Sequence, residues 1–98
     1  MLSGERSREI RQWLRTKLSL EEARAHFEAW ERDTMTLMGS AGGWISRFEK
    51  RIVANFQPGD EVWLYDSGQE SWAAVHGEKG MALVRNGVVV AVIVESSN

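Results

Sequence analysis

The feature that most constrains the fold is a β-hairpin signal in residues 80–95. Asn86 and Gly87 separate two apolar runs there. A two-residue type I′ turn requires positive φ at both central residues, which asparagine tolerates and glycine adopts without strain. We therefore predict a turn at these two residues, with strands over about 81–85 and 88–94.

The turn also determines which side chains share a face, because side chains alternate with a period of two along a strand. One face is predicted to carry the cross-strand pairs Arg85–Val88, Leu83–Val90 and Met81–Val92, and the other face Ala82, Val84, Val89, Ala91 and Ile93. Both faces are thus apolar, as in strands that are buried on both sides. If residues 88–94 were exposed to solvent, they would be prone to aggregation, since they are uncharged and mostly β-branched. We expect the chain's own helices or a second subunit to cover the hairpin.

The N-terminal part of the chain has the spacing of amphipathic helices. Over about 3–17, apolar residues recur at helical spacing, with arginines on the opposite side. Ser19 and Glu22 fit a capping box, which starts a second helix over about 20–38. Gly39 is suited to end that helix, and we expect the two helices to pack as a helical hairpin. The apolar seams are Ile10, Trp13, Leu14 and Leu18 in the first helix, and Leu20, Ala23, Phe27, Trp30, Thr34, Leu37 and Met38 in the second.

A glycine-rich loop over residues 39–43 follows and is a candidate hinge. It fits neither a phosphate loop nor a dinucleotide-binding motif, because no Gly-Lys-Ser/Thr follows it and no strand precedes it. A third helix is predicted over about 43–55. Its apolar face is Trp44, Ile45, Phe48, Ile52 and Phe56, and its opposite face is Arg47, Lys50 and Arg51.

The next segment predicts a strand and a short helix. Residues 57–60, Gln-Pro-Gly-Asp, form a turn, since proline disfavours the helical conformation in the residue before it. A strand over 61–65 follows. Ser67 and Glu70 fit a second capping box, which opens a short helix to about His76. In the strand, Val62 and Leu64 point to one side, and Trp63 and Tyr65 to the other.

Together these elements predict an α+β fold in one domain over residues 1–98. A helical half, residues 1–56, packs on a small, mainly antiparallel sheet of three strands in residues 57–98. The short helix connects the first two strands. A chain of this length can bury one hydrophobic core.

Composition excludes several kinds of site. The chain has no cysteine, which excludes a disulfide framework, a thiolate metal site and a cysteine nucleophile. Glu22 and His26 share a helix face, but a zinc site needs three or four protein ligands, so we expect no metal and no cofactor. No apolar run approaches the roughly 20 residues of a membrane span, and no secretory signal is visible. These observations predict a cytoplasmic protein without membrane contact.

The charges are unevenly distributed. The net charge is −2, but the first 18 residues are basic and the predicted sheet half is acidic. Arg8, Arg11 and Arg15 are predicted to line one side of the first helix, which makes them candidate anion-binding residues. An ordinary solvated face, or a face packed near the acidic end, gives the same pattern. A nucleic-acid-associated regulator that uses this helix is one alternative function, opposed by a pI of about 5.7 and by the lack of a reading motif.

One stretch resembles a group of small uncharacterised bacterial proteins. The resemblance covers roughly residues 59–90, and it rests on the motifs Gly59-Asp60-Glu61-Val62-Trp63, Ser71-Trp72 and Gly80 with Ala82-Leu83-Val84-Arg85-Asn86-Gly87. These are structural glycines, tryptophans and a turn rather than reactive groups. The resemblance implies a fold and a bacterial source, and it implies no catalytic residue.

The pattern of residues favours a non-enzymatic protein that binds another protein, or binds itself as a homodimer. The chain has five tryptophans and a strand that is apolar on both sides, and it has no evident active site. Tyr65, Trp72 and Arg85 are the candidate interface residues, with ordinary packing as the alternative.

A small hydrolase with a site around Asp66, Ser71 and His76 is a further alternative, because a catalytic triad uses these residue types. The spacing does not match a nucleophile elbow, and Asp66 is already explained by its place between the strand and the helix cap.

Overall fold

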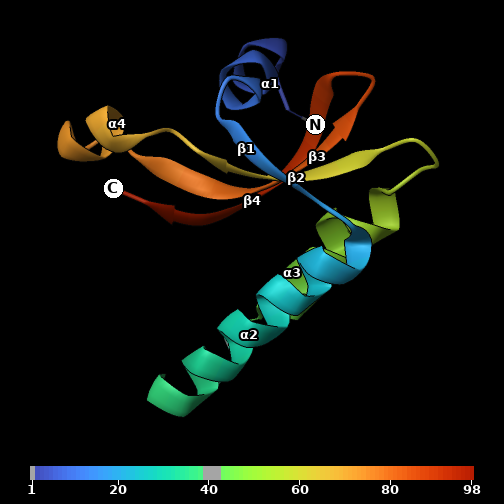
Figure 1. Ribbon diagram of the computed structural model, residues 1–98, viewed down its shortest axis with the longest axis vertical. Helices are drawn as coiled ribbons and strands as arrows, with labels where there is room; N and C mark the ends of the chain where they lie inside the picture. The colour runs from blue at the N-terminus through green and yellow to red at the C-terminus, as the bar shows by residue number, and fades with distance from the viewer. Residues whose placement is uncertain (1, 39–42) are drawn as a thin grey trace.

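The computed structural model describes residues 2–38 and 43–98. It is an α+β fold in which one antiparallel sheet, in the order β1-β2-β3-β4, lies between helices (Figure 1). Helix α1 covers one face of the sheet, and α2 and α3 cover the other (Figure 1). The elements are α1 (Gly4–Arg11), β1 (Leu14–Leu18), α2 (Leu20–Met38), α3 (Trp44–Arg51), the 3-10 helix η1 (Val53–Asn55), β2 (Glu61–Asp66), α4 (Gln69–Ala73), β3 (Glu78–Arg85) and β4 (Val88–Ser97).

The predicted first helix over 3–17 is wrong in its second half. Helix α1 ends at Arg11, and β1 follows as a fourth strand, antiparallel to β2. The sequence Leu-Arg-Thr-Lys-Leu also alternates with a period of two, and pairing with β2 satisfies backbone groups that an isolated helix end leaves open. The sheet therefore has four strands instead of three, and its first strand comes from the predicted helical half.

The predicted helical hairpin is also wrong. Helix α1 lies against β4, whereas α2 packs on α3 across the sheet from it (Figure 1). The start of α2 is confirmed, because the Glu22 backbone N–H donates to Ser19 Oγ at 3.1 Å and the Ser19 N–H donates to Glu22 Oε1 at 2.9 Å. The candidate hinge covers residues 39–43, and of these only Gly43 belongs to the described residues, where it precedes α3 with a φ of 74°.

Helix α3 buries the face that the sequence predicts. Phe48 and Ile52 are fully buried, and the Trp44 ring stacks on Phe27 of α2 with 5.8 Å between ring centroids. Arg47, Lys50 and Arg51 are exposed. The predicted span of 43–55 is correct only in part, because the α-helix ends at Arg51 and η1 completes the segment.

The hairpin turn is confirmed, with positive φ at Asn86 (52°) and Gly87 (78°). Both faces of the hairpin are covered, as predicted, by two groups of buried side chains. The α1 cluster consists of Ile10, Tyr65, Ala82, Val84 and Val89. The α2–α3 cluster consists of Ala23, Phe27, Phe48, Ile52, Val62, Met81, Leu83 and Ile93.

The predicted register is correct at the turn and wrong beyond it. Arg85 pairs with Val88 and Val84 with Val89, but the next pair is Leu83 with Ala91. A β-bulge at Val90 adds one residue to β4, which exchanges the faces of the side chains from Ala91 to Val94. Ile93 therefore packs with Met81 on the α2–α3 side, while Val92 packs against the α1 cluster.

The short helix α4 begins later and ends earlier than predicted. The residue before it is Gly68, which makes no side-chain cap. The Ser67 hydroxyl instead accepts the backbone N–H of Glu78 at 3.0 Å, and Asp66 Oδ1 accepts the backbone N–H of Gly68 at 2.8 Å. Ser67 thus ties the α4 segment to β3 rather than capping the helix.

Substitution of Gly80 tests the close approach of β3 and β4. A Cβ at this residue would lie 2.1 Å from the Ile93 carbonyl oxygen, so Gly80→Ala forces the strands apart. We expect Gly80→Ala to lower the free energy of unfolding by about 1–3 kcal/mol in urea denaturation. Gly4→Ala is the control, because its Cβ meets only the flexible end of Arg8, and a change within about 0.5 kcal/mol is expected. Equal stability of the two variants would contradict the close approach.

Val75 is a β-branched residue in the left-handed region, with φ of 64° and 65% of its surface exposed. This conformation costs an L-residue roughly 1–2 kcal/mol, and asparagine tolerates it better. We expect Val75→Asn to raise the free energy of unfolding by about 1 kcal/mol in the same measurement. Val88→Asn, at an exposed valine with ordinary strand geometry, serves as the control and gives no gain.

Candidate functional site

The two edges of the sheet differ in length and charge. The β1 edge is five residues long, carries Arg15 and Lys17, and is bulged near Arg15. The β4 edge is ten residues long and has no charged side chain before Glu95. Short, bulged and charged edges discourage pairing with another chain, whereas long uncharged edges invite it. The β4 edge is thus the open side of the sheet.

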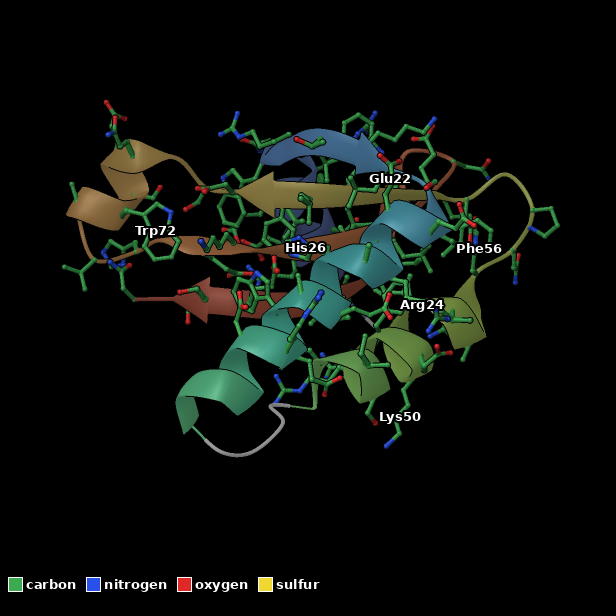
Figure 2. All side chains as sticks on the ribbon, turned by 60° about the horizontal axis from the view of Figure 1, so that its bottom comes forward. Glu22, Arg24, His26, Lys50, Phe56 and Trp72 are labelled. Carbon is green, nitrogen blue, oxygen red and sulfur yellow. The ribbon has the colours of Figure 1, made fainter. Side chains whose placement is uncertain are left out.

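A groove of about 710 Å³ runs along the β4 edge. Its floor is the first half of β4, and its walls are the start of α1 and the end of α3. Figure 2 shows β4 as the outermost strand, with Lys50 pointing outward on the same side. The lining residues are Leu2, Ser3, Gly4, Ser7, Lys50, Arg51, Asn55, Arg85, Val88, Val89, Val90, Ala91 and Val92.

Two side chains hold the helices to this edge. Ser7 is 6% exposed, and its hydroxyl accepts the backbone N–H of Val89 at 2.9 Å. Arg51 Nη1 donates to the backbone carbonyl of Val92 at 3.2 Å. Because N–H and C=O of one residue point to the same side of an antiparallel strand, the N–H of Val92 also faces the groove. Side chains therefore occupy part of the β4 edge.

The groove is surrounded by positive charge. Lys50, Arg51 and Arg85 line it, while the described lining residues include no carboxylate. The Arg8 guanidinium lies beside Gly4 in the wall, and the Arg11 guanidinium lies beside Gly87 at the hairpin turn.

Among the described residues, Arg85 is the one lining cation that has a carboxylate partner. Its guanidinium donates to Asp60 at 2.8–3.3 Å, and Nη2 also donates to the Asn55 carbonyl at 2.7 Å. The Asp60 side chain is only 2% exposed, and its hydrogen bond with Arg85 lowers the pKa of Asp60. Arg85 therefore fixes the hairpin to the turn before β2.

The structure does not bring the three candidate interface residues together. Tyr65 is 2% exposed, and its ring lies 6.3 Å from Trp13. Trp72 covers Gly77, and its indole N–H donates to Asp66 Oδ1 at 2.9 Å. Arg85 is the last residue of β3, whereas Tyr65 pairs with Gly80 near the start of that strand. These packing roles leave Arg85 as the only one of the three that lines the groove.

The candidate anion-binding residues lie on two elements instead of one helix face. Arg8 and Arg11 belong to α1, near the groove. Arg15 belongs to β1, and its Nε donates to the Asp66 carbonyl at 3.2 Å. Anion binding by Arg8 and Arg11 stays a prediction, and Arg15 faces a different part of the molecule.

The residues of the hydrolase alternative have structural contacts. Asp66 Oδ1 accepts hydrogen bonds from the Gly68 amide and the Trp72 indole, and these two bonds lower the pKa of Asp66. Ser71 Oγ donates to the Ser67 carbonyl at 3.4 Å. His76 is exposed, and in the described part of the chain no hydrogen bond joins its ring to Ser71. The three side chains form no hydrogen-bonded triad.

A second cavity, of about 340 Å³, lies beside α2 on the other half of the sheet. His26 points from α2 toward the sheet (Figure 2) and pairs with Glu95, whose side chain is 4% exposed. Arg15, Lys79 and Asp66 also line this cavity, and Arg15 donates to the Asp66 backbone carbonyl. The lining residues are Arg15, His26, Trp30, Leu64, Tyr65, Asp66, Lys79, Gly80 and Glu95.

Sequence reasoning missed Ser7 and Arg51 as groove residues. Ser7 lies three residues before Ile10, so the spacing of one helix face is the available signal for its burial. Arg51 gives no such signal, because an exposed arginine on a helix does not reveal which strand lies beside it. The location of the groove depends on β4 being an edge strand.

Neither a metal centre nor a membrane span is found in the described part of the chain. Within residues 2–38 and 43–98, no cluster of three or more His, Asp or Glu side chains is placed to hold a metal ion. The helices of the same residues are too short or too polar to cross a membrane.

Tyr65 provides a pH test of the α1 cluster. Burial, together with its 2.6 Å hydrogen bond to Glu78, raises the pKa of Tyr65 above its ordinary value of about 10. A raised folded-state pKa stabilises the fold below pH 10, and this stability is lost as pH rises further. Because the chain has one tyrosine, we expect tyrosinate absorbance only when the protein unfolds, whereas denaturant-unfolded chain ionises near pH 10. Ionisation near pH 10 with an intact circular dichroism spectrum would contradict this placement.

Comparisons with protein-family models, curated proteins and solved structures find no match. The resemblance of residues 59–90 therefore stays an expectation, and the function of the chain has to be argued from its own geometry.

Proposed function

We propose that this protein is a non-enzymatic binding module that receives an extended segment of another protein along β4. The observation that carries the proposal is the edge strand itself, which is ten residues long, uncharged over its first seven residues and placed at the floor of a groove. A segment added there continues the sheet through backbone hydrogen bonds. Its side chains point alternately to the two faces of the sheet, toward the start of α1 on one side and the end of α3 on the other.

Exposed apolar surface in the groove supports this function. Val88, which lines the groove, is 51% exposed. Val94 lies further along β4, beyond the groove, and is 38% exposed. Between these two residues, both faces of β4 pack against the protein's own helices, so the side of the strand that stays free is its edge. Edge pairing is therefore the binding mode that the fold leaves open.

A random library of displayed 12-residue peptides provides the test. We expect enriched peptides to bind wild-type protein, and to slow hydrogen exchange at the Val92 amide, which faces the groove. Val88→Asn is expected to weaken binding about fivefold, because it removes roughly 1 kcal/mol of apolar contact. Val75→Asn is the matched control, since it replaces another exposed valine, outside the groove, and leaves binding unchanged.

Several outcomes would overturn the proposal. Enriched peptides that are insensitive to Val88→Asn and leave Val92 exchange unchanged would place binding elsewhere. If no peptide of the library is enriched, the proposed peptide-binding function is wrong. A dimer in light scattering, with Val92 protected in the unliganded protein, would make a second copy of the chain the occupant of the edge.

A further inference from the structure

We infer that the segment bound along β4 is acidic, and that one of its carboxylates draws Arg51 away from the Val92 carbonyl and so opens the edge for pairing. This inference rests on the proposed function and names the chemistry of the partner. In the unliganded protein, Arg51 donates to the outward-facing carbonyl of Val92, which an added strand would need as a hydrogen-bond acceptor. The partner must therefore provide a better acceptor for the guanidinium.

The first argument is charge complementarity. Four cations surround the groove without a carboxylate partner among the described residues, namely Arg8, Arg11, Lys50 and Arg51. The protein as a whole is acidic, so this cluster of uncompensated positive charge is local. Complementary charge steers association and favours one sign of partner.

The second argument is the strength of the Arg51 contact. Arg51 is exposed and donates through one nitrogen to a neutral carbonyl at 3.2 Å. A guanidinium bonds a carboxylate through two parallel, charge-assisted hydrogen bonds, which are roughly twice as strong as bonds between neutral groups. An incoming carboxylate thus releases the Val92 carbonyl, which then accepts an N–H from the new strand.

The groove chemistry favours a peptide over a nucleic acid. Single-stranded nucleic acids bind through stacking of bases on aromatic rings. The described lining of the groove contains valine, alanine and leucine side chains and no aromatic ring. A second copy of this chain fits less well, because residues 88–94 have no carboxylate to offer Arg51.

Three synthetic ten-residue peptides test the inference, in which valine alternates with glutamate, glutamine or lysine. At 50 mM salt we expect the glutamate peptide to bind at least tenfold tighter than the glutamine peptide, and the lysine peptide not to bind. The difference shrinks at 500 mM salt, because ions screen exposed charges. Bound glutamate peptide slows hydrogen exchange at Val92.

Arg51→Gln separates the specific role of Arg51 from the electrostatic attraction of the other cations around the groove. This variant is expected to lose at least fivefold in affinity for the glutamate peptide and none for the glutamine peptide. Arg47→Gln is the matched control on the same helix, because Arg47 lies over the Trp44 ring outside the groove, and it changes neither affinity.

Each other outcome has a distinct meaning. Equal binding of the glutamate and glutamine peptides, with Val92 protected, would overturn the acidic partner while the proposed function stands. Loss of glutamate preference in Arg47→Gln but not in Arg51→Gln would overturn the role of Arg51. Failure of both peptides, together with an unenriched library, would remove the proposed function itself. Stronger competition by oligothymidylate than by the glutamate peptide would make nucleic acid the partner.

Discussion

The structure depends on the burial of one hairpin from both sides. Residues from Gly80 to Val84 of β3 are buried without interruption, and their side chains alternate between the α1 cluster and the α2–α3 cluster. A strand of this kind is stable only when both faces are covered. The helices bury these two faces, with α1 on one side and the α2–α3 pair on the other.

Polar contacts connect the cover to the sheet. Ser7 bonds the β4 edge from α1, Arg51 bonds it from α3, and Tyr65 donates to Glu78, which also pairs with Arg6 of α1 at 2.5 Å. Among the described residues, no buried side-chain nitrogen or oxygen lacks a partner. Because an unpaired buried polar group is costly, these contacts determine where each helix can lie on the apolar faces. They also place the walls of the groove beside β4.

The candidate site follows from an asymmetry between the edges of the sheet. On one side of the hairpin, β2 pairs with β3, and the short, charged strand β1 follows as the edge. The other side ends at β4, whose apolar sequence is explained by burial of its two faces, although its edge stays open. The same residues that complete the core therefore provide the floor of the groove, and the arginines and lysine on the flanking helices give it positive charge.

Local interactions explain what the sequence by itself determined. Residues that are near neighbours in the chain determine the Asn86-Gly87 turn, the Ser19–Glu22 capping box and the apolar face of α3. The apolar run of residues 88–94 likewise indicates that both faces of the hairpin are buried.

Tertiary structure decided the rest. Leu14–Leu18 satisfies a helical and a strand pattern equally, and only the free edge of β2 selects the strand. The bulge at Val90 exchanges the faces of Ile93 and Val92 because of what packs on each side. The groove is equally non-local, since no pattern within β4 shows that this strand is the last of the sheet or that Ser7 and Arg51 meet at its edge.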